Sequence, residues 1–194
     1  MTAQGNLFPV FLKLTGRTVV VVGAGSVAAS KLSALVEAGA QVRVVAPEIG
    51  SNIERLGVSI VRRAFQPDDL DGAWLVVAAA TSEVNRQVAD AANARRVFVN
   101  AVDDPANASA YLGGVVRRGG VTFAISTDGR APALAGLLRE GLDAVLPASD
   151  LERWMSDAET LRDRWRADGV PMDARRPLLL KALIRRYADT GAAK

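Results

Sequence analysis

Residues 18–28 read TVVVVGAGSVA. Four valines in succession after a threonine are typical of a strand that is buried on both faces, and the glycine that follows ends it. Apolar residues then recur at the spacing of one helix face, at Ala28, Leu32, Leu35 and Val36. Gly39 supplies a stop signal for that helix. This stretch therefore predicts a strand, a tight turn and a helix in immediate succession.

The turn, residues 23–28, has the form G-x-G-x-x-A. In such a turn Gly23 permits the tight reversal, Gly25 lets a pyrophosphate approach the backbone, and Ala28 permits close packing of helix on strand. The first turn of the helix also offers free N–H groups and a partial positive charge. Because the hexapeptide lies between a predicted strand and a predicted helix, it indicates a dinucleotide-binding site rather than a purely structural turn.

The alternation of strand and helix continues as far as residue 100. Further strands are predicted at 41–46, 58–62, 74–79 and 97–100, and helices at 51–56 and 83–94. Alternation of this kind is typical of a parallel sheet with helices on both faces. The predicted fold class is α/β, with an N-terminal Rossmann-like, doubly wound sheet.

After residue 100 the pattern changes. Strands are predicted at 111–116 and 121–126, joined by a hairpin connection at 117–120, and helices at 132–145 and 150–187 with a break at 169–171. We therefore expect three parts: an NAD-binding Rossmann domain at 1–105, a central α/β dimerisation region at 106–148, and a small helical C-terminal domain at 149–194.

The central strands predict the assembly. They carry Tyr111, Leu112, Val115 and Val116 and would leave open edges and an apolar face in a monomer. Pairing across a two-fold axis would cover both, so we expect a homodimer with elements exchanged between subunits.

Composition restricts the chemistry. The 194 residues include no cysteine and no histidine, so a base must be a carboxylate, a hydroxyl, a lysine or a bound cofactor. The net charge of +3 fits an ordinary surface or a site for a polyanionic small molecule. Aromatic residues make up only 5%, with no basic run among them, so no nucleic-acid partner is expected. With neither a secretory signal nor a membrane-length apolar stretch in view, we expect a cytoplasmic protein without a membrane partner.

Acidic residues mark two candidate positions. Asp103 and Asp104 follow the fifth strand, at the edge where such sheets bind ligands. They either form a turn or helix cap, or one of them is the catalytic base, since the chain has no histidine or cysteine for that role. Glu48, just after the second strand, either binds the adenosine ribose or is an exposed acid in the loop. Arg43, within that strand, could instead bind the extra phosphate of NADP, so NADP remains an alternative cofactor.

Residues 126–132 read STDGRAP, between a strand and a helix. They form either a loop with a helix cap or a polar rim in which Arg130 binds a carboxylate.

Several of these motifs occur together in a known family. They are FPVFLKLTGRTVVVVGAGSVA, EAGAQVRVVAPE, AAATSEVNRQVADAA, FVNAVDDP and VTFAISTDGRAPALAGLLREGL. In this order, and over nearly the whole chain, the sequence resembles the precorrin-2 dehydrogenase/sirohydrochlorin ferrochelatase family, which also forms the N-terminal part of siroheme synthase.

The resemblance implies NAD-dependent oxidation of a tetrapyrrole, precorrin-2, to sirohydrochlorin in siroheme or cobalamin biosynthesis, often followed by insertion of Fe2+. The family's N-x-V-D motif places the catalytic carboxylate at Asp103, which would also hold the iron transiently in a chelatase. The family's dinucleotide contacts match Ser26, Val27, Pro47 and Glu48. Together with the glycine turn, the predicted cofactor-binding residues are Gly23, Ala24, Gly25, Ser26, Val27, Ala28, Pro47, Glu48 and Thr81. The predicted substrate-binding residues are Ser126, Thr127 and Arg130.

The sequence departs from the family in two places. Gly113 and Gly114 stand where relatives often carry an aromatic residue and a proline, which could loosen the strand or reshape the subunit contact. No methyltransferase domain follows the helical segment, so we expect methylation on another protein. Two other functions stay open: a nucleotide-sensing module without catalysis, and a dehydrogenase of an unrelated small metabolite.

Overall fold

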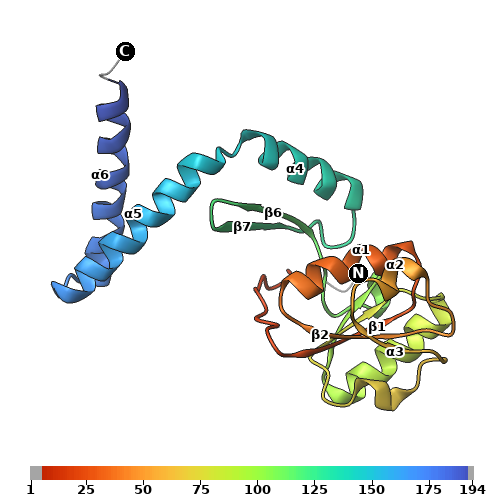
Figure 1. Ribbon diagram of the computed structural model, residues 1–194. Helices are drawn as coiled ribbons and strands as arrows, with labels where there is room; N and C mark the ends of the chain where they lie inside the picture. Colours follow the sequence, from red (N-terminus) through yellow and green to blue (C-terminus); the bar gives the residue numbers. More distant parts are fainter. Residues whose placement is uncertain (1–5, 192–194) are drawn as a thin grey trace. The chain divides into compact units, whose positions relative to one another are not determined.

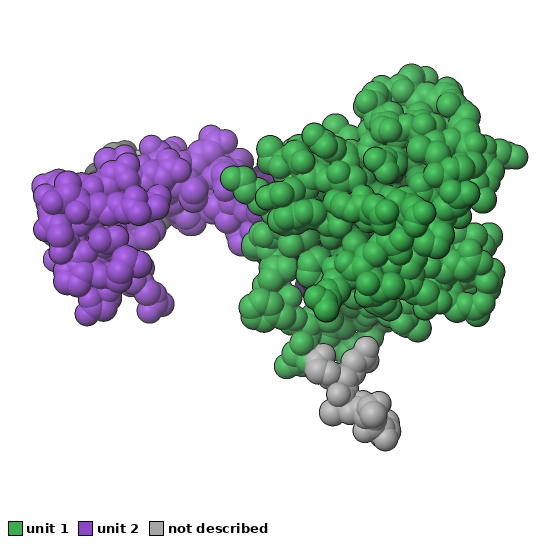
Figure 2. All heavy atoms as spheres, turned by 90° about the horizontal axis from the view of Figure 1, so that it is seen from below, with its two compact units in different colours: residues 1–112, 128–130 green, residues 113–127, 131–194 purple. Residues whose placement is uncertain are grey.

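The computed structural model describes residues 6–191, with the side chains of residues 6–185. Residues 1–5 lie outside the described residues; the first predicted domain begins there, and a secretory signal would begin there too. Residues 192–194, the end of the last predicted domain, also lie outside them. The chain divides into two compact units (Figure 2). Unit 1 contains the residues up to 112 together with 128–130, and unit 2 contains 113–127 and the residues from 131 onward. The division into three domains, with boundaries near residues 105 and 148, stays a prediction.

Unit 1 contains a parallel sheet of five strands in the order β3-β2-β1-β4-β5 (Figure 1). The strands are β1 (Thr18–Val22), β2 (Gln41–Val45), β3 (Ser59–Val61), β4 (Leu75–Ala78) and β5 (Phe98–Ala101). The helices between them are α1 (Ser26–Glu37), α2 (Ser51–Glu54) and α3 (Ser82–Arg95), with the short 3-10 turns η1 (Pro67–Leu70) and η2 (Pro105–Asn107). This order confirms the predicted Rossmann-like, doubly wound sheet.

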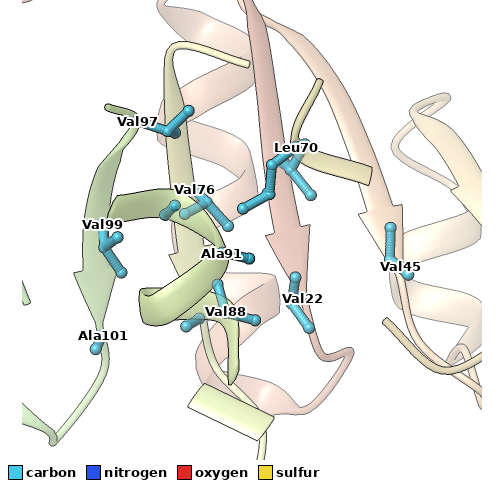
Figure 3. Packing of buried hydrophobic residues seen from close by; sticks show 12 residues of the cluster. Val22, Val45, Leu70, Val76, Val88, Ala91, Val97, Val99 and Ala101 are labelled. Atoms are coloured by element: carbon cyan, nitrogen blue, oxygen red, sulfur yellow. The ribbon is translucent and has the colours of Figure 1, made fainter. Parts of the chain in front are cut away.

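Both faces of the sheet are buried, which explains the valine run of β1. Val19 and Val21 pack with α1 and α2, whereas Val20 and Val22 pack on the other face with α3. In Figure 3, Val88 on α3 lies over the strand that carries Val22. Alternate side chains of a strand point to opposite faces, so a strand between two helical layers must be apolar at every position.

Unit 2 contains an antiparallel hairpin and three helices. The hairpin consists of β6 (Gly114–Arg118) and β7 (Val121–Ile125), and the helices are α4 (Pro132–Val145), α5 (Ala148–Ala167) and α6 (Met172–Gly191). Helix α4 packs against β6. None of the helices within residues 6–191 combines the length and the apolar composition needed to cross a membrane.

Two details of the hairpin correct the sequence prediction. The strand predicted from residue 111 begins at Gly114, and the connection is only Gly119–Gly120, so Arg117 and Arg118 belong to β6. Both connecting glycines have positive φ, 51° and 77°, as a type I′ turn requires. Arg118 belongs to the strand because it pairs with Val121 of β7, and its guanidinium group also donates to both carboxylate oxygens of Asp143 on α4, at 2.9 Å each.

The two glycines that depart from the family pattern permit close backbone contacts. A Cβ atom at Gly113 would lie 2.0 Å from the carbonyl oxygen of Ile125, at the base of the hairpin. A Cβ atom at Gly114 would lie 3.1 Å from the carbonyl oxygen of Ala135, so α4 approaches β6 closely there. Both glycines thus permit close backbone packing, while a loosened strand or a reshaped subunit contact stays a prediction.

Candidate functional site

The carboxyl edge of the sheet in unit 1 contains the point where the strand order reverses. Helix α1 connects β1 to β2 on one side, and β4 lies on the other side of β1. Open α/β sheets bind nucleotides at such a point, in the crevice outside the carboxyl ends of the strands.

Gly23, directly after β1, lies against the loop that follows β4. Its φ is +104°, a conformation that other residues rarely adopt, and its N–H donates to the carbonyl oxygen of Val45 at 2.9 Å. A Cβ atom on Gly23 would lie 2.2 Å from the carbonyl oxygen of Ala79, in the loop after β4. Backbone conformation and packing thus both require glycine at this position.

Gly25 is different, because nothing in the protein requires glycine there. Its φ and ψ are −74° and −178°, which any residue can adopt, and a Cβ atom would meet no atom within 4 Å. The position is exposed and is the N-cap of α1. Open space beside a bare backbone is what the close approach of a pyrophosphate needs, so this turn fits a dinucleotide.

The N-terminus of α1 is free to bind an anion. The first N–H with a helical acceptor is that of Ala29, which donates to the carbonyl oxygen of Gly25 at 3.1 Å. The N–H groups of Ser26, Val27 and Ala28 come before it, no side chain caps the helix, and its first turn has no acidic residue. Ser26 and Val27 are exposed, whereas the side chain of Ala28 is buried in the core.

The loop after β2 carries Pro47 and Glu48, both exposed at the same edge of the sheet. The nearby cations that follow β3 have partners: Arg62 pairs with Glu54, and Arg63 donates to Asp69 at 2.6 and 2.7 Å. The hydrogen bonds from Arg63 hold the pKa of the buried Asp69 below its usual range.

Arg43 lies inside β2 rather than at its end. Its positive charge acts on Asp69 and also lowers the pKa of that carboxyl. Glu48 is an exposed acid at this edge of the sheet and stays the predicted ligand of the adenosine ribose.

Asp103 and Asp104 follow β5 at the same edge and have different roles in the loop. Asp103 is exposed and has a positive φ of 55°, a strained conformation for a residue other than glycine. Asp104 is the N-cap residue of η2, and its carboxylate accepts a hydrogen bond from the Asn107 amide at 2.7 Å. The turn interpretation therefore describes Asp104, and the exposed carboxylate at the sheet edge is that of Asp103.

Thr81 caps the helix that follows β4. Its hydroxyl oxygen accepts from the N–H of Val84 at 3.4 Å, and its carbonyl oxygen accepts from the N–H of Asn85 at 2.8 Å. Sequence reasoning missed Asn85, which is buried and accepts from the N–H of Ala80 at 3.0 Å. A signal existed, because Asn85, Val88 and Ala92 recur at helix spacing on the buried face of α3 and only the first is polar.

The residues predicted to bind substrate belong to both units. Ser126 and Thr127 lie in unit 2, where the Thr127 hydroxyl oxygen accepts from the N–H of Ala131 at 3.2 Å. Arg130 lies in unit 1, is exposed, and has a guanidinium nitrogen 3.7 Å from the Asp128 carboxylate. The adjacent Gly129 packs against Tyr111 and Pro105, so Arg130 is held close to the segment that follows Asp104.

The glycine turn at the strand-order reversal, the uncapped helix after it and the carboxylates at the same edge define a dinucleotide-binding Rossmann domain. Residues 10–114 match a family described as "Putative NAD(P)-binding", and the chain belongs to this family.

Named relatives give the comparison more detail. Siroheme synthase 3 of Aeromonas hydrophila subsp. hydrophila is 41% identical over 176 residues, covering 88% of this chain and 37% of that protein. Siroheme synthase of Photorhabdus laumondii is 39% identical over 188 residues, covering 94% of this chain and 40% of that protein. The chain thus spans about two fifths of the length of these relatives.

One solved structure matches most of the chain. It is described as SirC, a precorrin-2 dehydrogenase, and is 25% identical with a TM-score of 0.70, covering 90% of this chain and 88% of that one. Together with the siroheme synthases, it confirms the resemblance predicted from the sequence motifs.

Proposed function

We propose that this chain is an NAD-dependent dehydrogenase that oxidises precorrin-2 to sirohydrochlorin in the biosynthesis of siroheme or cobalamin. The observation that carries the proposal is one sheet edge that combines the glycine turn at residues 23–28 with the exposed carboxylate of Asp103. The likeness to proteins named siroheme synthase and precorrin-2 dehydrogenase supports this choice of substrate.

The proposed reaction needs a group that accepts a proton. Dehydrogenation of precorrin-2 removes one hydride and one proton. NAD, when bound at the turn, supplies the hydride acceptor. Asp103 receives the proton, because the chain has no histidine and Asp104 is engaged with Asn107.

The substrate is a polycarboxylate, which the proposed site would bind through cations and hydroxyl groups. Arg130 of unit 1 offers a guanidinium group for one carboxylate. Ser126 and Thr127 of unit 2 stay predicted substrate-binding residues. Neither a nucleic acid nor a membrane has a part in this proposal, and the cytoplasm, where NAD is supplied, stays the expected compartment.

A second step, insertion of Fe2+ into sirohydrochlorin, is proposed for the same carboxylate. Iron is then a substrate held only transiently by Asp103, which can also take a pyrrole proton as the metal enters. Among the described side chains, residues 6–185, no three His, Cys, Asp or Glu residues form a group that could hold a metal ion.

The first prediction concerns cofactor choice. The carboxylate of Glu48 would repel a phosphate on the adenosine ribose, while Arg62 and Arg63 are engaged with their own partners. We expect kcat/KM for NAD to exceed that for NADP by about tenfold or more, the effect of one unfavourable charge contact. Glu48→Gln should narrow this ratio. Equal or better use of NADP by the unaltered chain would reject the assignment of Glu48.

The second prediction concerns assembly. The sheet of unit 2 consists of the two strands of the hairpin alone. Four large apolar side chains of α4 are exposed: Leu134, Leu137, Leu138 and Val145. An isolated two-stranded sheet is marginally stable, and a second copy would cover this surface. We expect a homodimer by analytical sedimentation at micromolar concentration, and Leu137→Glu should dissociate it. A monomeric mass for the unaltered chain would contradict the prediction.

The function is tested by incubating the chain with NAD and precorrin-2 in the absence of oxygen. We expect NADH and the sirohydrochlorin absorbance to rise together. A nucleotide sensor would bind NAD without forming NADH, and a dehydrogenase of another metabolite would leave precorrin-2 unchanged.

A further inference from the structure

Asn85 is a buried polar residue that the proposed chemistry does not use. It lies in the first turn of α3, is 3% exposed, and accepts a hydrogen bond from the N–H of Ala80 through its Oδ1 atom at 3.0 Å. A polar side chain at a core-facing position costs free energy unless its bonds are satisfied there. The bond to Ala80 therefore gives this residue a place in the core.

The bonded N–H belongs to the peptide that lies against the nucleotide turn. The same peptide unit contains the carbonyl group of Ala79, and its oxygen lies 2.2 Å from the Cβ position that Gly23 leaves empty. Because a trans peptide is planar, its C=O and N–H groups point in opposite directions. Asn85 thus binds the N–H group of this peptide, while its C=O group lies against Gly23.

The rest of the loop is held on either side of this peptide. The N–H of Ala79 donates to the carbonyl oxygen of Val22 at 2.9 Å, and the Thr81 hydroxyl caps α3. The peptide between Ala79 and Ala80 is the one unit whose orientation depends on a side chain from the core. Without Asn85, the Ala80 N–H would lose its partner and the Ala79 carbonyl would be free to rotate away from Gly23.

We propose that Asn85 is a positioning residue for the dinucleotide: it fixes the peptide between Ala79 and Ala80 against the Gly23 turn and so keeps the crevice in its binding shape. This inference rests on the proposed binding of NAD. It predicts an effect on NAD affinity, with little effect on turnover once NAD is saturating, since Asn85 is not the proposed base.

The test is the Kd for NAD of the full chain, measured by calorimetry without tetrapyrrole, together with KM and kcat. Asn85→Ala should raise both Kd and KM by about tenfold, the usual effect of losing one buried hydrogen bond.

The control is Val88→Ala, one turn further along the same buried face of α3. It should lower Tm, because a core side chain is truncated, and leave the Kd for NAD unchanged. If Asn85→Ala does not fold, Asn85→Ser, whose shorter side chain falls short of Ala80, takes its place.

The inference is overturned if the alanine or serine variant binds NAD as the unaltered chain does, or if Val88→Ala weakens NAD binding equally. Absence of NAD binding by the unaltered chain would instead overturn the proposed function.

Discussion

Replacing Asp103 by asparagine is expected to slow precorrin-2 dehydrogenation by at least about tenfold to a hundredfold, because a general base is removed. The affinity for NAD should stay near its original value, because the glycine turn is untouched. Single-turnover formation of NADH at saturating NAD is the measurement. If the chain inserts iron, the same substitution should also weaken that step.

Asparagine is the substitution that isolates the carboxylate. Asp103 has a φ of +55°, a region that asparagine and aspartate tolerate better than other side chains, so the backbone of the loop is preserved. Alanine would add strain to the loss of the base. Asp104→Asn, one residue on, is the matched control, because it replaces a carboxylate that is bonded to Asn107.

Near-normal formation of NADH by a folded Asp103→Asn protein would rule out the assigned role. A comparable loss from Asp104→Asn would mean that the other carboxylate of the pair is the base.

The second large effect is expected from Gly25→Asp. Aspartate is among the best N-cap residues, so it should stabilise α1 relative to glycine by a few tenths of a kcal/mol. Its carboxylate would accept hydrogen bonds from the free N–H groups at the start of α1 and would repel a pyrophosphate. We expect the Kd for NAD to rise by about a hundredfold, equivalent to about 2.7 kcal/mol, while Tm stays the same or rises.

A weaker affinity for NAD without a lower Tm would show that Gly25 serves ligand binding and not the stability of the fold. Gly25→Ser, a good cap without charge, should give a smaller loss of affinity and the same Tm behaviour. Gly23→Ala should instead lower Tm, because the added methyl group would overlap the carbonyl oxygen of Ala79. Unchanged NAD affinity in Gly25→Asp would place the dinucleotide elsewhere.

The sheet of unit 1 could be predicted because its determinants are local. The valines of β1 face both layers of the core, so every position of the strand had to be apolar, and a tight glycine turn follows at once. The turn residues, Glu48 and Asp103 all follow strand ends, and parallel strands bring their carboxyl ends to one edge. The chain order alone thus placed these residues together.

The start of the central hairpin could not be predicted, because distant residues decide it. Tyr111 has a strand-like side chain, yet it packs against Gly129 and precedes the strand. Arg118 is polar and borders a glycine pair, which is typical of a turn, but its partner is Asp143, 25 residues further on. Local patterns contain no trace of such contacts.

The role of Asn85 was hidden for a similar reason. Its position on the buried face of α3 can be read from the sequence, but its partner is a backbone N–H in a loop. Only the fold shows that this loop lies against Gly23.

The most direct test of the account is one anaerobic single turnover, with the chain in excess over precorrin-2 and NAD saturating. NADH and sirohydrochlorin should form in equal amounts and at the same rate, because one hydride and one proton leave each substrate molecule. A folded chain that binds NAD and yet forms no NADH from precorrin-2 would contradict the proposed function.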